Sequence, residues 1–262
     1  MNKVYLANSR EWYENQEQID TYLNLINSTY GSGIVQSEDL LLKNNLDKIV
    51  SSFSSSMHYI DLGPGNGKKT LFLCEAFARA KKLEYYTAVD IQPQFLEITN
   101  TIKEKFGSTT LAVEESFENF LDRNFTNRNP SFIYLGATYG NFKQDYIEPK
   151  LRKFMQTQDQ IYLSSGLFPD NIEEAISKYG ASLPMFKSIA KKQCLPEGGE
   201  FKVIFSEENS TIEQVYQYQN TMYVLGISKK PTEKAFRSQV SKYFNGEFFI
   251  EQSHIGFLGR KK

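Results

Sequence analysis

The first part of the chain, up to about Phe53, carries apolar residues at helical spacing. They form two stripes, the first of Trp12, Ile19, Tyr22, Leu23 and Ile26 and the second of Leu40, Leu41, Ile49 and Phe53. Each stripe predicts a helix, and Ser37 is a suitable N-cap for the second one. We expect Ser28–Ser32 to be a loop between them, so that residues 1–56 form an N-terminal helical segment.

From Met57 onward, short apolar runs alternate with amphipathic stretches. The runs predict strands at Met57–Leu62, Tyr85–Asp90, Thr110–Val113, Phe132–Leu135 and Ile161–Ser164. The stretches between them predict helices at Lys69–Lys82, Pro93–Phe106, Glu118–Leu121 and Ile147–Met155. This alternation indicates the α/β class, with a Rossmann-like, doubly wound and mostly parallel sheet over residues 57–170.

The remaining part, residues 171–262, has a different pattern, in which predicted strands follow one another. Phe201–Phe205 and Ile212–Tyr218 flank a polar loop and predict a hairpin. A further strand at Met222–Ile227, a helix at Thr232–Phe244 and a strand at Phe248–Gln252 follow. We expect a smaller C-terminal α+β part that completes the sheet and caps it.

Composition and charge exclude several classes of protein. A hydrophobic content of 40% and a charged content of 23% are typical of a soluble globular protein. The net charge of −1 offers no overall basic field, so no nucleic-acid partner is expected. Two distant cysteines and two histidines argue against a metal site or a Cys-His nucleophile. No leader-like segment or membrane-length apolar run is visible, so we expect a cytoplasmic protein without a membrane partner.

Candidate chemistry begins where the first predicted strand ends. Asp61 is followed by a turn with alternating Gly63, Gly65 and Gly67, and a helix comes next. Glycine lets the backbone turn tightly and approach a ligand, and the free N–H groups of the helix start favour an anionic group. Asp90, at the end of the following strand, can accept hydrogen bonds from both hydroxyls of a ribose. The glycine spacing differs from the G-x-G-x-x-G of dinucleotide enzymes. The alternative is a purely structural turn with Asp90 capping its strand.

These residues resemble class I S-adenosylmethionine-dependent methyltransferases. More narrowly, the chain resembles the family of the histidine-specific Nα-methyltransferase of ergothioneine biosynthesis. The resemblance lies in Trp12-Tyr13-Glu14, a tyrosine segment at Tyr30, the turn from Asp61 to Thr70, Asp90, and Leu135-Gly136-Ala137-Thr138-Tyr139-Gly140-Asn141. It covers roughly two thirds of the chain and fades after Asp170.

The resemblance implies S-adenosylmethionine as the cofactor and a small-molecule amine or amino acid as the substrate. The implied cofactor-binding residues are Asp61, Gly63, Gly65, Gly67, Lys69, Asp90, Ser116, Phe117 and Gly136. Lys69 would pair with the methionine carboxylate, and Phe117 would flank the adenine. Tyr13, Tyr30 and Asn141 would bind the substrate, with Asn141 and Tyr13 as the catalytic residues. The expected reaction is a direct SN2 transfer of a methyl group to the substrate amine.

Two departures from the family pattern leave the acceptor open. Ser116 stands where the family has an aspartate, so the carboxylate that faces the adenine is missing or is supplied by Glu115 or Glu118. The family's C-terminal Glu-x-Ser, which reads the imidazole of histidine, has no clear counterpart around 222–234. The acceptor is therefore histidine, another amino acid, an amine or a peptide end. The rival interpretations are a methyltransferase with a macromolecular acceptor and a non-catalytic cofactor-binding partner protein.

Overall fold

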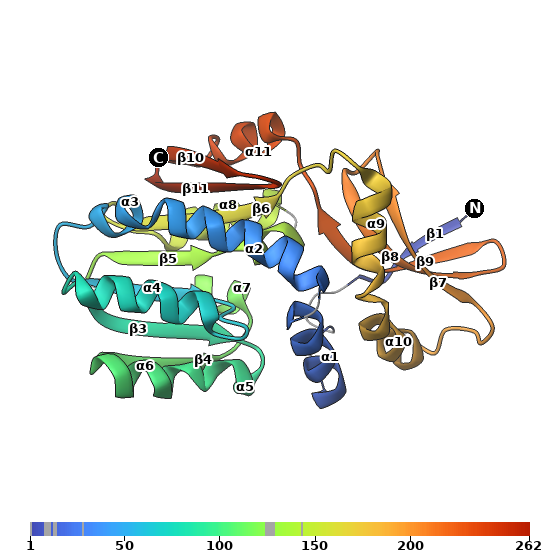
Figure 1. Ribbon diagram of the computed structural model, residues 1–262, viewed down its shortest axis with the longest axis horizontal. Helices are drawn as coiled ribbons and strands as arrows, with labels where there is room; N and C mark the ends of the chain where they lie inside the picture. Colours follow the sequence, from blue (N-terminus) through green and yellow to red (C-terminus); the bar gives the residue numbers. More distant parts are fainter. Residues whose placement is uncertain (1, 8–11, 13–14, 28, 124–128, 143) are drawn as a thin grey trace. The chain divides into compact units, whose positions relative to one another are not determined.

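The chain divides into two compact units. The computed structural model describes residues 2–7, 12, 15–27, 29–123, 129–142 and 144–262, with the backbone alone at 29–36 and 144–145. The core unit consists of residues 38–165 and 233–262, and the small-sheet unit consists of residues 1–37 and 166–232. In Figure 1 the core unit carries blue, green and red segments, and the small-sheet unit joins the dark-blue start of the chain to orange strands. The expected boundaries at 56/57 and 170/171 thus differ from this division.

A mostly parallel sheet forms the centre of the core unit. Among the described residues it has seven strands in the order β10-β11-β6-β5-β2-β3-β4. Their bounds are β2 Met57–Leu62, β3 Leu83–Asp90, β4 Thr109–Glu114, β5 Ser131–Leu135, β6 Gln160–Gly166, β10 Phe244–Glu251 and β11 His254–Lys261. Strands β2 to β6 pair in parallel, whereas β10 and β11 pair antiparallel. The predicted α/β class with a doubly wound, mostly parallel sheet is confirmed. The strand order reverses between β2 and β5, where ligands bind in open sheets of this kind.

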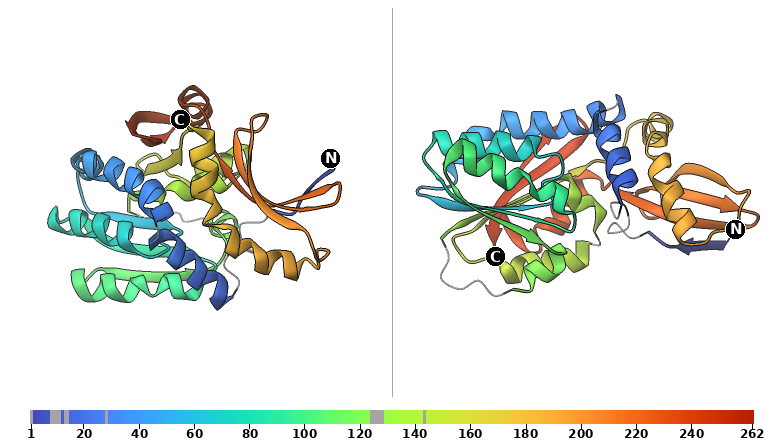
Figure 2. Two further views of the ribbon diagram at one scale, coloured as in Figure 1. Left: turned by 45° about the vertical axis from the view of Figure 1, so that its right-hand side comes forward. Right: turned by 90° about the horizontal axis from the view of Figure 1, so that it is seen from below.

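Helices lie on both faces of this sheet, as the right-hand view of Figure 2 shows for α4 and α8. They are α2 Thr29–Asn44, which begins in the small-sheet unit, α3 Leu46–Ser51, α4 Lys68–Arg79, α5 Pro93–Leu96, α6 Ile98–Phe106, α7 Phe117–Leu121, α8 Gln144–Phe154 and α11 Glu233–Val240. Because both faces are covered, β5 is buried along its whole length. This explains why its sequence is a continuous apolar run instead of an alternating one.

Aromatic rings fill the core between the sheet and α4. Tyr59 of β2 lies 5.3 Å from Tyr86 and 5.4 Å from Phe132, measured between ring centroids. On the neighbouring strands, Tyr134 stacks on Tyr162 at 5.4 Å with an angle of 10° between the rings. All five rings are buried. Close packing of this kind leaves little room for rearrangement, so the hydroxyls at the ring ends are held in place.

The small-sheet unit is built around a second sheet, in the order β1-β9-β8-β7. Its strands are β1 Asn2–Tyr5, β7 Glu200–Ser206, β8 Thr211–Tyr218 and β9 Thr221–Lys229, and its helices include α1 Gln16–Asn27, α9 Ile172–Gly180 and α10 Leu183–Lys192. Trp12 contacts the ring of Phe186 edge to face at 5.7 Å, and its indole N–H donates to the carbonyl of Leu225 at 3.4 Å. The stripe that contains Trp12 therefore serves the core of this unit.

Several of the elements predicted from the sequence can be compared with those of the structure. Strand β2 has the predicted bounds, and the predicted hairpin is confirmed by the antiparallel pairing of β7 with β8. The predicted loop at Ser28–Ser32 is wrong, because α2 begins at Thr29 and continues through the glycines. Each glycine costs a helix only about 1 kcal/mol relative to alanine, which the buried remainder of α2 can offset. Ser37 consequently lies inside α2 and does not cap it.

Candidate functional site

The glycine turn after β2 has the backbone geometry for which glycine is needed. Gly63, Gly65 and Gly67 have φ values of 86°, 53° and 72°, in the region that side chains disfavour. A Cβ atom on Gly67 would lie 2.7 Å from Cδ1 of Ile98, and one on Gly63 would lie 3.1 Å from Cζ of Phe117. Helix α4 starts directly after this turn. The turn therefore brings the positive end of the helix dipole to the carboxyl edge of the sheet.

Asp61 holds this turn from inside the core. Its carboxylate is fully buried and accepts hydrogen bonds from the hydroxyls of Thr70 at 2.5 Å, Tyr59 at 3.3 Å and Tyr86 at 3.4 Å. Burial raises the pKa of Asp61 to about 7, and these hydrogen bonds oppose part of the increase. The bond to Thr70 ties the end of β2 to the first turn of α4.

Asp90 ends the neighbouring strand β3 and is 7% exposed. Its Oδ1 atom accepts from the backbone N–H of Gln92 at 3.0 Å. Burial raises the pKa of the Asp90 carboxyl to about 6, and the backbone N–H groups of Gln92 and Ile91 lower it in part. A buried carboxylate that backbone N–H groups hold at the end of a strand is suited to accept hydrogen bonds from neutral hydroxyl groups.

The segment after β4 closes the same edge of the sheet. The backbone N–H of Glu115 donates to the carbonyl of Asp90 at 3.1 Å, which joins the two strand ends. Ser116 is buried and caps α7 by accepting from the N–H of Asn119 at 3.3 Å. The ring of Phe117 reaches back to Gly63. Glu115 is engaged in an ion pair with Arg123 at 2.8 Å, which limits its use as a contact for an adenine.

The loop after β5 begins at Gly136 and continues as the short 3₁₀ helix η2, Ala137–Asn141. Tyr139 anchors it from below, because its buried hydroxyl donates to the carboxylate of Glu148 in α8. Asn141 is the last residue of η2 and is partly exposed. We call residues 136–141 the acceptor loop, after the substrate-binding role that the resemblance implies for Asn141.

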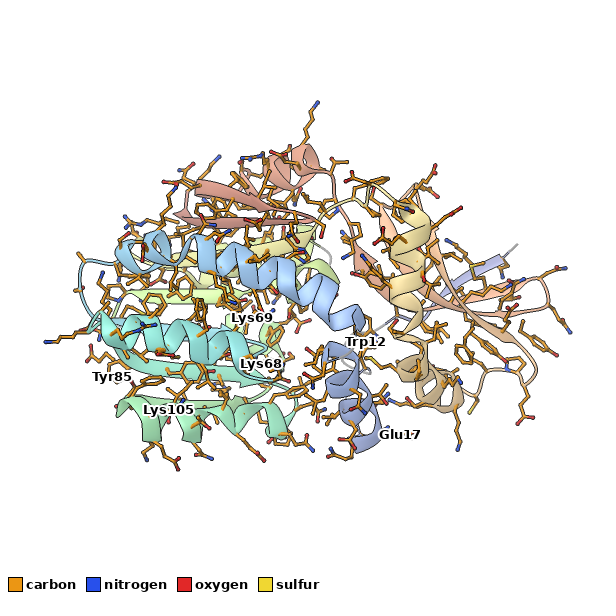
Figure 3. All side chains as sticks on the ribbon, in the orientation of Figure 1. Trp12, Glu17, Lys68, Lys69, Tyr85 and Lys105 are labelled. Atoms are coloured by element: carbon orange, nitrogen blue, oxygen red, sulfur yellow. The ribbon has the colours of Figure 1, made fainter. Side chains whose placement is uncertain are left out.

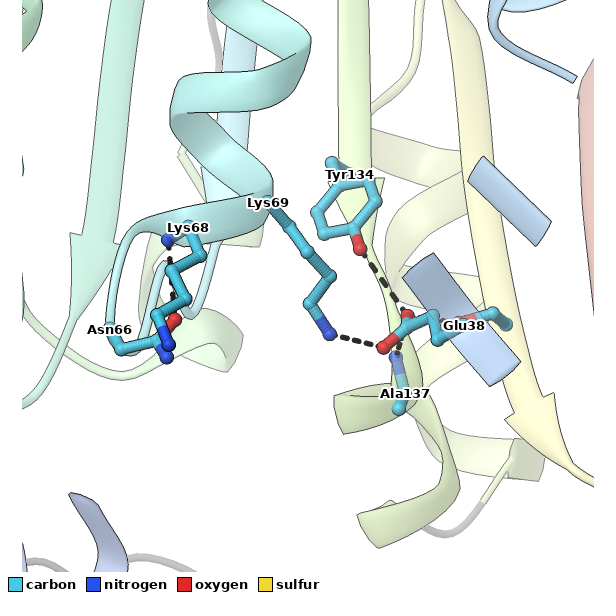
Figure 4. Close-up of polar contacts among 7 residues, drawn as sticks. Glu38, Asn66, Lys68, Lys69, Tyr134 and Ala137 are labelled. Carbon is cyan, nitrogen blue, oxygen red and sulfur yellow. Dashed lines mark hydrogen bonds and ion pairs between the residues drawn. The ribbon is translucent and has the colours of Figure 1, made fainter. Parts of the chain in front are cut away.

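Sequence reasoning missed the residue that connects these parts, Glu38 of α2. Its carboxylate is 1% exposed and forms an ion pair with Lys69 of α4. Figure 3 marks Lys69 on α4, and Figure 4 shows its side chain reaching from the first turn of this helix to the carboxylate of Glu38. The sequence did contain a signal for this role. Glu38 stands three positions before Leu41 and four before Leu42, so it lies with them on the buried face of α2.

The structure thus gathers most of the predicted cofactor residues at one edge. The carboxyl ends of parallel strands meet there, and the residues concerned are Gly63, Gly65, Gly67, Lys69, Asp90, Ser116, Phe117 and Gly136. Asp61 lies beneath them in the core. Tyr13 lies outside the described residues, and Tyr30 belongs to the part of α2 described by its backbone alone. Their substrate-binding roles therefore stay predictions.

Two further features of the described part of the chain bear on function. Nowhere in it do three or more His, Cys, Asp or Glu side chains gather as a metal site requires. None of its helices is both long enough and apolar enough to cross a membrane.

Comparison with known proteins identifies the family. Residues 33–171, more than half of the chain, match the model of the family described as histidine-specific, S-adenosylmethionine-dependent methyltransferases. The chain belongs to this family. Its membership confirms the predicted resemblance and S-adenosylmethionine as the cofactor. A relative, the N-methyltransferase fsqC of Aspergillus fumigatus, is 26% identical over 179 residues, which are 64% of this chain and 49% of that protein. The chain therefore spans about half the length of this relative.

Two solved structures share the fold. The PH0226 protein from Pyrococcus horikoshii has a TM-score of 0.53 at 14% identity, over 90% of this chain and 94% of that one. A putative methyltransferase from Thermobifida fusca has a TM-score of 0.52 at 11% identity, over 87% of this chain and 81% of that one. At such low identities these similarities show the architecture of the chain and nothing beyond it.

The residues at the edge of the sheet fit S-adenosylmethionine. The buried carboxylate of Asp90 is held in place by backbone N–H groups. It can still accept hydrogen bonds from the ribose hydroxyls. The positive-φ turn would bring the cofactor close to the backbone at Gly63 and Gly65, where a side chain would stand in the way. Lys69, 28% exposed, can meet the methionine carboxylate at the start of α4. Phe117 borders the same turn, where its ring would flank the adenine as the resemblance implies.

Proposed function

We propose that the protein is an S-adenosylmethionine-dependent N-methyltransferase that acts on the amino group of an amino acid or a related small amine. The observation that carries the proposal is the acceptor loop, which leaves β5 next to the glycine turn of β2 and ends in the partly exposed amide of Asn141. The relative from Aspergillus fumigatus, named an N-methyltransferase, supports nitrogen as the acceptor atom.

The roles of the residues follow from their chemistry. When bound, S-adenosylmethionine supplies a methyl group already activated on a sulfonium. Asp90 orients the ribose, and Lys69 with the start of α4 holds the methionine carboxylate. Asn141 accepts a hydrogen bond from the acceptor amine without adding a charge beside the sulfonium. Alignment of the nitrogen lone pair with the S–CH₃ bond provides the rate increase, since proximity and orientation alone lower such barriers substantially.

The chemistry also sets a requirement on protonation. An ammonium has no lone pair, so one proton leaves the acceptor before transfer. The bound cofactor would supply the methyl group to this lone pair, and the electron pair of its S–CH₃ bond would remain on sulfur. Both cysteines of the chain are free, as is usual in the reducing cytoplasm, and we include this location in the proposal.

The test is methyl transfer from deuteromethyl-labelled S-adenosylmethionine to a panel of amino acids and simple amines, read by mass spectrometry. We expect one labelled product class, whose mass increments give the number of methyl groups. Binding of S-adenosylhomocysteine without any labelled product would contradict the small-amine acceptor. It would favour a macromolecular acceptor or a non-catalytic binding role.

Replacement of Asn141 tests the acceptor site separately. Asn141→Ala should raise the KM of the acceptor by about tenfold or more, because it removes the hydrogen-bond acceptor proposed for the substrate amine. The Kd of S-adenosylhomocysteine should stay within about twofold. Asn129→Ala is the matched control, since Asn129 precedes β5 at its opposite end and donates to Glu84. Equal losses in acceptor and cofactor binding would refute the assignment of Asn141.

A further inference from the structure

One carboxylate, that of Glu38, receives hydrogen bonds from several elements of the core unit. Its Oε1 atom accepts from the backbone N–H of Ala137 at 2.8 Å, from the hydroxyl of Ser164 at 2.5 Å and from that of Tyr134 at 3.3 Å. Its Oε2 atom accepts from the ammonium of Lys69. Figure 4 shows the tip of Glu38 meeting Lys69 from the side, Tyr134 from above and Ala137 from below. The two oxygens therefore serve different parts of the site.

The surroundings of Glu38 are closely packed. Tyr134 is stacked on Tyr162 and buried in the core. A Cβ atom on Gly136 would lie 2.5 Å from both Oε1 of Glu38 and the hydroxyl oxygen of Tyr134. Glycine at this position thus allows the acceptor loop to pass directly over the carboxylate. The start of the loop is thereby placed by Glu38 as well as by β5.

The charge of Glu38 is maintained despite its burial. Desolvation favours the neutral form, but the ammonium of Lys69, the Ser164 hydroxyl and His254 outweigh it and hold the pKa at about 2. Lys69 remains 28% exposed, so the same ammonium can reach a second carboxylate at the surface of the site. An ion pair of this kind orients the lysine before the cofactor arrives, which reduces the entropy lost on binding.

We propose that Glu38 is a positioning residue of the methyl transfer, which holds the Lys69 ammonium at the glycine turn and the Ala137 N–H in the acceptor loop in a fixed relation. This inference rests on the proposed function, because it assumes that Lys69 binds the cofactor and that the acceptor loop binds the substrate amine. Through Glu38, helix α2 sets the cofactor site and the acceptor site together.

The division of labour between the two oxygens makes the test specific. A glutamine side chain has one acceptor oxygen and one NH₂ donor. In Glu38→Gln the amide oxygen can still accept from Tyr134, Ala137 and Ser164. The NH₂ group then faces the ammonium of Lys69. We expect the Kd of S-adenosylhomocysteine and the KM of S-adenosylmethionine to rise by about tenfold to a hundredfold, as for other lost charge-assisted hydrogen bonds. The kcat should change much less. Glu38→Ala should raise the same KM and also lower kcat, since the acceptor loop loses its anchor.

A double-mutant cycle with Lys69 separates positioning from general support of the fold. Lys69→Met should weaken S-adenosylhomocysteine binding about as much as Glu38→Gln does, and the double variant should be no weaker than Lys69→Met alone. The matched control is Asp159→Asn. Asp159 is also a buried carboxylate and accepts from the N–H groups of Ser131 at 2.8 Å and Gln156 at 2.7 Å, at the amino end of β5. Its variant should lose stability but keep KM and kcat within about twofold.

Each outcome decides between the alternatives. Kinetic constants of Glu38→Gln that match those of Asp159→Asn, with both variants less stable than the wild type, would show a structural ion pair and overturn the inference. Effects of Glu38→Gln and Lys69→Met that multiply in the double variant would do the same. If Glu38→Ala does not fold, the Glu38→Gln and Lys69→Met cycle still decides. Wild-type protein that binds no S-adenosylhomocysteine would instead overturn the proposed function, and this inference with it.

Discussion

Replacing Asp61 by asparagine should change how the stability of the core unit depends on pH. Burial raises the pKa of this carboxyl to about 7 in the folded chain, whereas an aspartate in an unfolded chain titrates near about 3.9. Between these values the folded state keeps a proton that the unfolded state has lost. The free energy of unfolding of the wild type therefore falls as the pH rises through this window, and the loss is complete above the folded-state pKa.

The size of the effect follows from the difference between the two pKa values. About three pKa units correspond to about 4 kcal/mol when both states are fully ionised. Between about pH 5 and pH 8, the part that changes is about 2 to 3 kcal/mol. An asparagine has no proton to lose, so Asp61→Asn removes this part. The variant also places an amide N–H₂ where, among the described residues, Oδ1 of Asp61 has no hydrogen-bond partner. This unsatisfied amide lowers the free energy of unfolding by the same amount at every pH.

The measurement is urea unfolding of the wild type and of Asp61→Asn, followed by far-ultraviolet circular dichroism at several pH values. The only tryptophan, Trp12, lies in the small-sheet unit, so its fluorescence follows that unit separately. We expect the variant to gain about 2 to 3 kcal/mol relative to the wild type between about pH 5 and pH 8. Thr70→Val, which removes a donor that lowers the pKa of Asp61, should extend the wild-type decline to higher pH. A difference between wild type and Asp61→Asn that stays constant over this range would refute the reasoning.

Two other predictions concern the cofactor site and the acceptor loop. Since burial raises the pKa of Asp90 to about 6 and ribose hydroxyls prefer the ionised carboxylate, calorimetry should show S-adenosylhomocysteine affinity falling as the pH drops below this value, by up to about tenfold per pH unit. The fall should be absent in Asp90→Asn, and an equally steep fall there would contradict the assignment. Gly136→Ala should cost about 1 to 3 kcal/mol in urea unfolding, because the new methyl group meets buried oxygens of Glu38 and Tyr134. Gly180→Ala, with open space at its Cβ at the end of α9, is the control and should not lose stability; it should gain up to about 1 kcal/mol.

The local pattern of the chain was sufficient for the parts of the core unit that are continuous in sequence. Strand β2 could be predicted with its bounds, because an apolar run lies between a serine-rich segment and a glycine turn. The hairpin of β7 and β8 was predictable for a similar reason, since its strands flank a short polar loop. Glycines did not end α2 at Ser28–Ser32, because the propensity of two residues is a small term beside the burial of Leu41 and Leu42.

Sequence alone did not reveal the parts that depend on pairing between distant segments. The final strand β11 was missed, although it is buried between β10 and β6. Strands β7 to β9 form a sheet of their own with β1, instead of completing the large sheet. Nothing local marks which sheet a strand joins, since strand pairing depends on burial and register in the whole fold.

By itself, the sequence determined the fold class, the family and the residues of the glycine turn, because short-range steric rules and a motif of fixed spacing carry them. Only the tertiary structure decided what the charged residues do. It placed Asp61 in the core, left Asp90 at the edge of the sheet, and joined Glu38 to Lys69 over 31 positions of the chain. The physical reason is that a pKa or an ion pair depends on burial and on distances in space, which spacing along a chain does not specify.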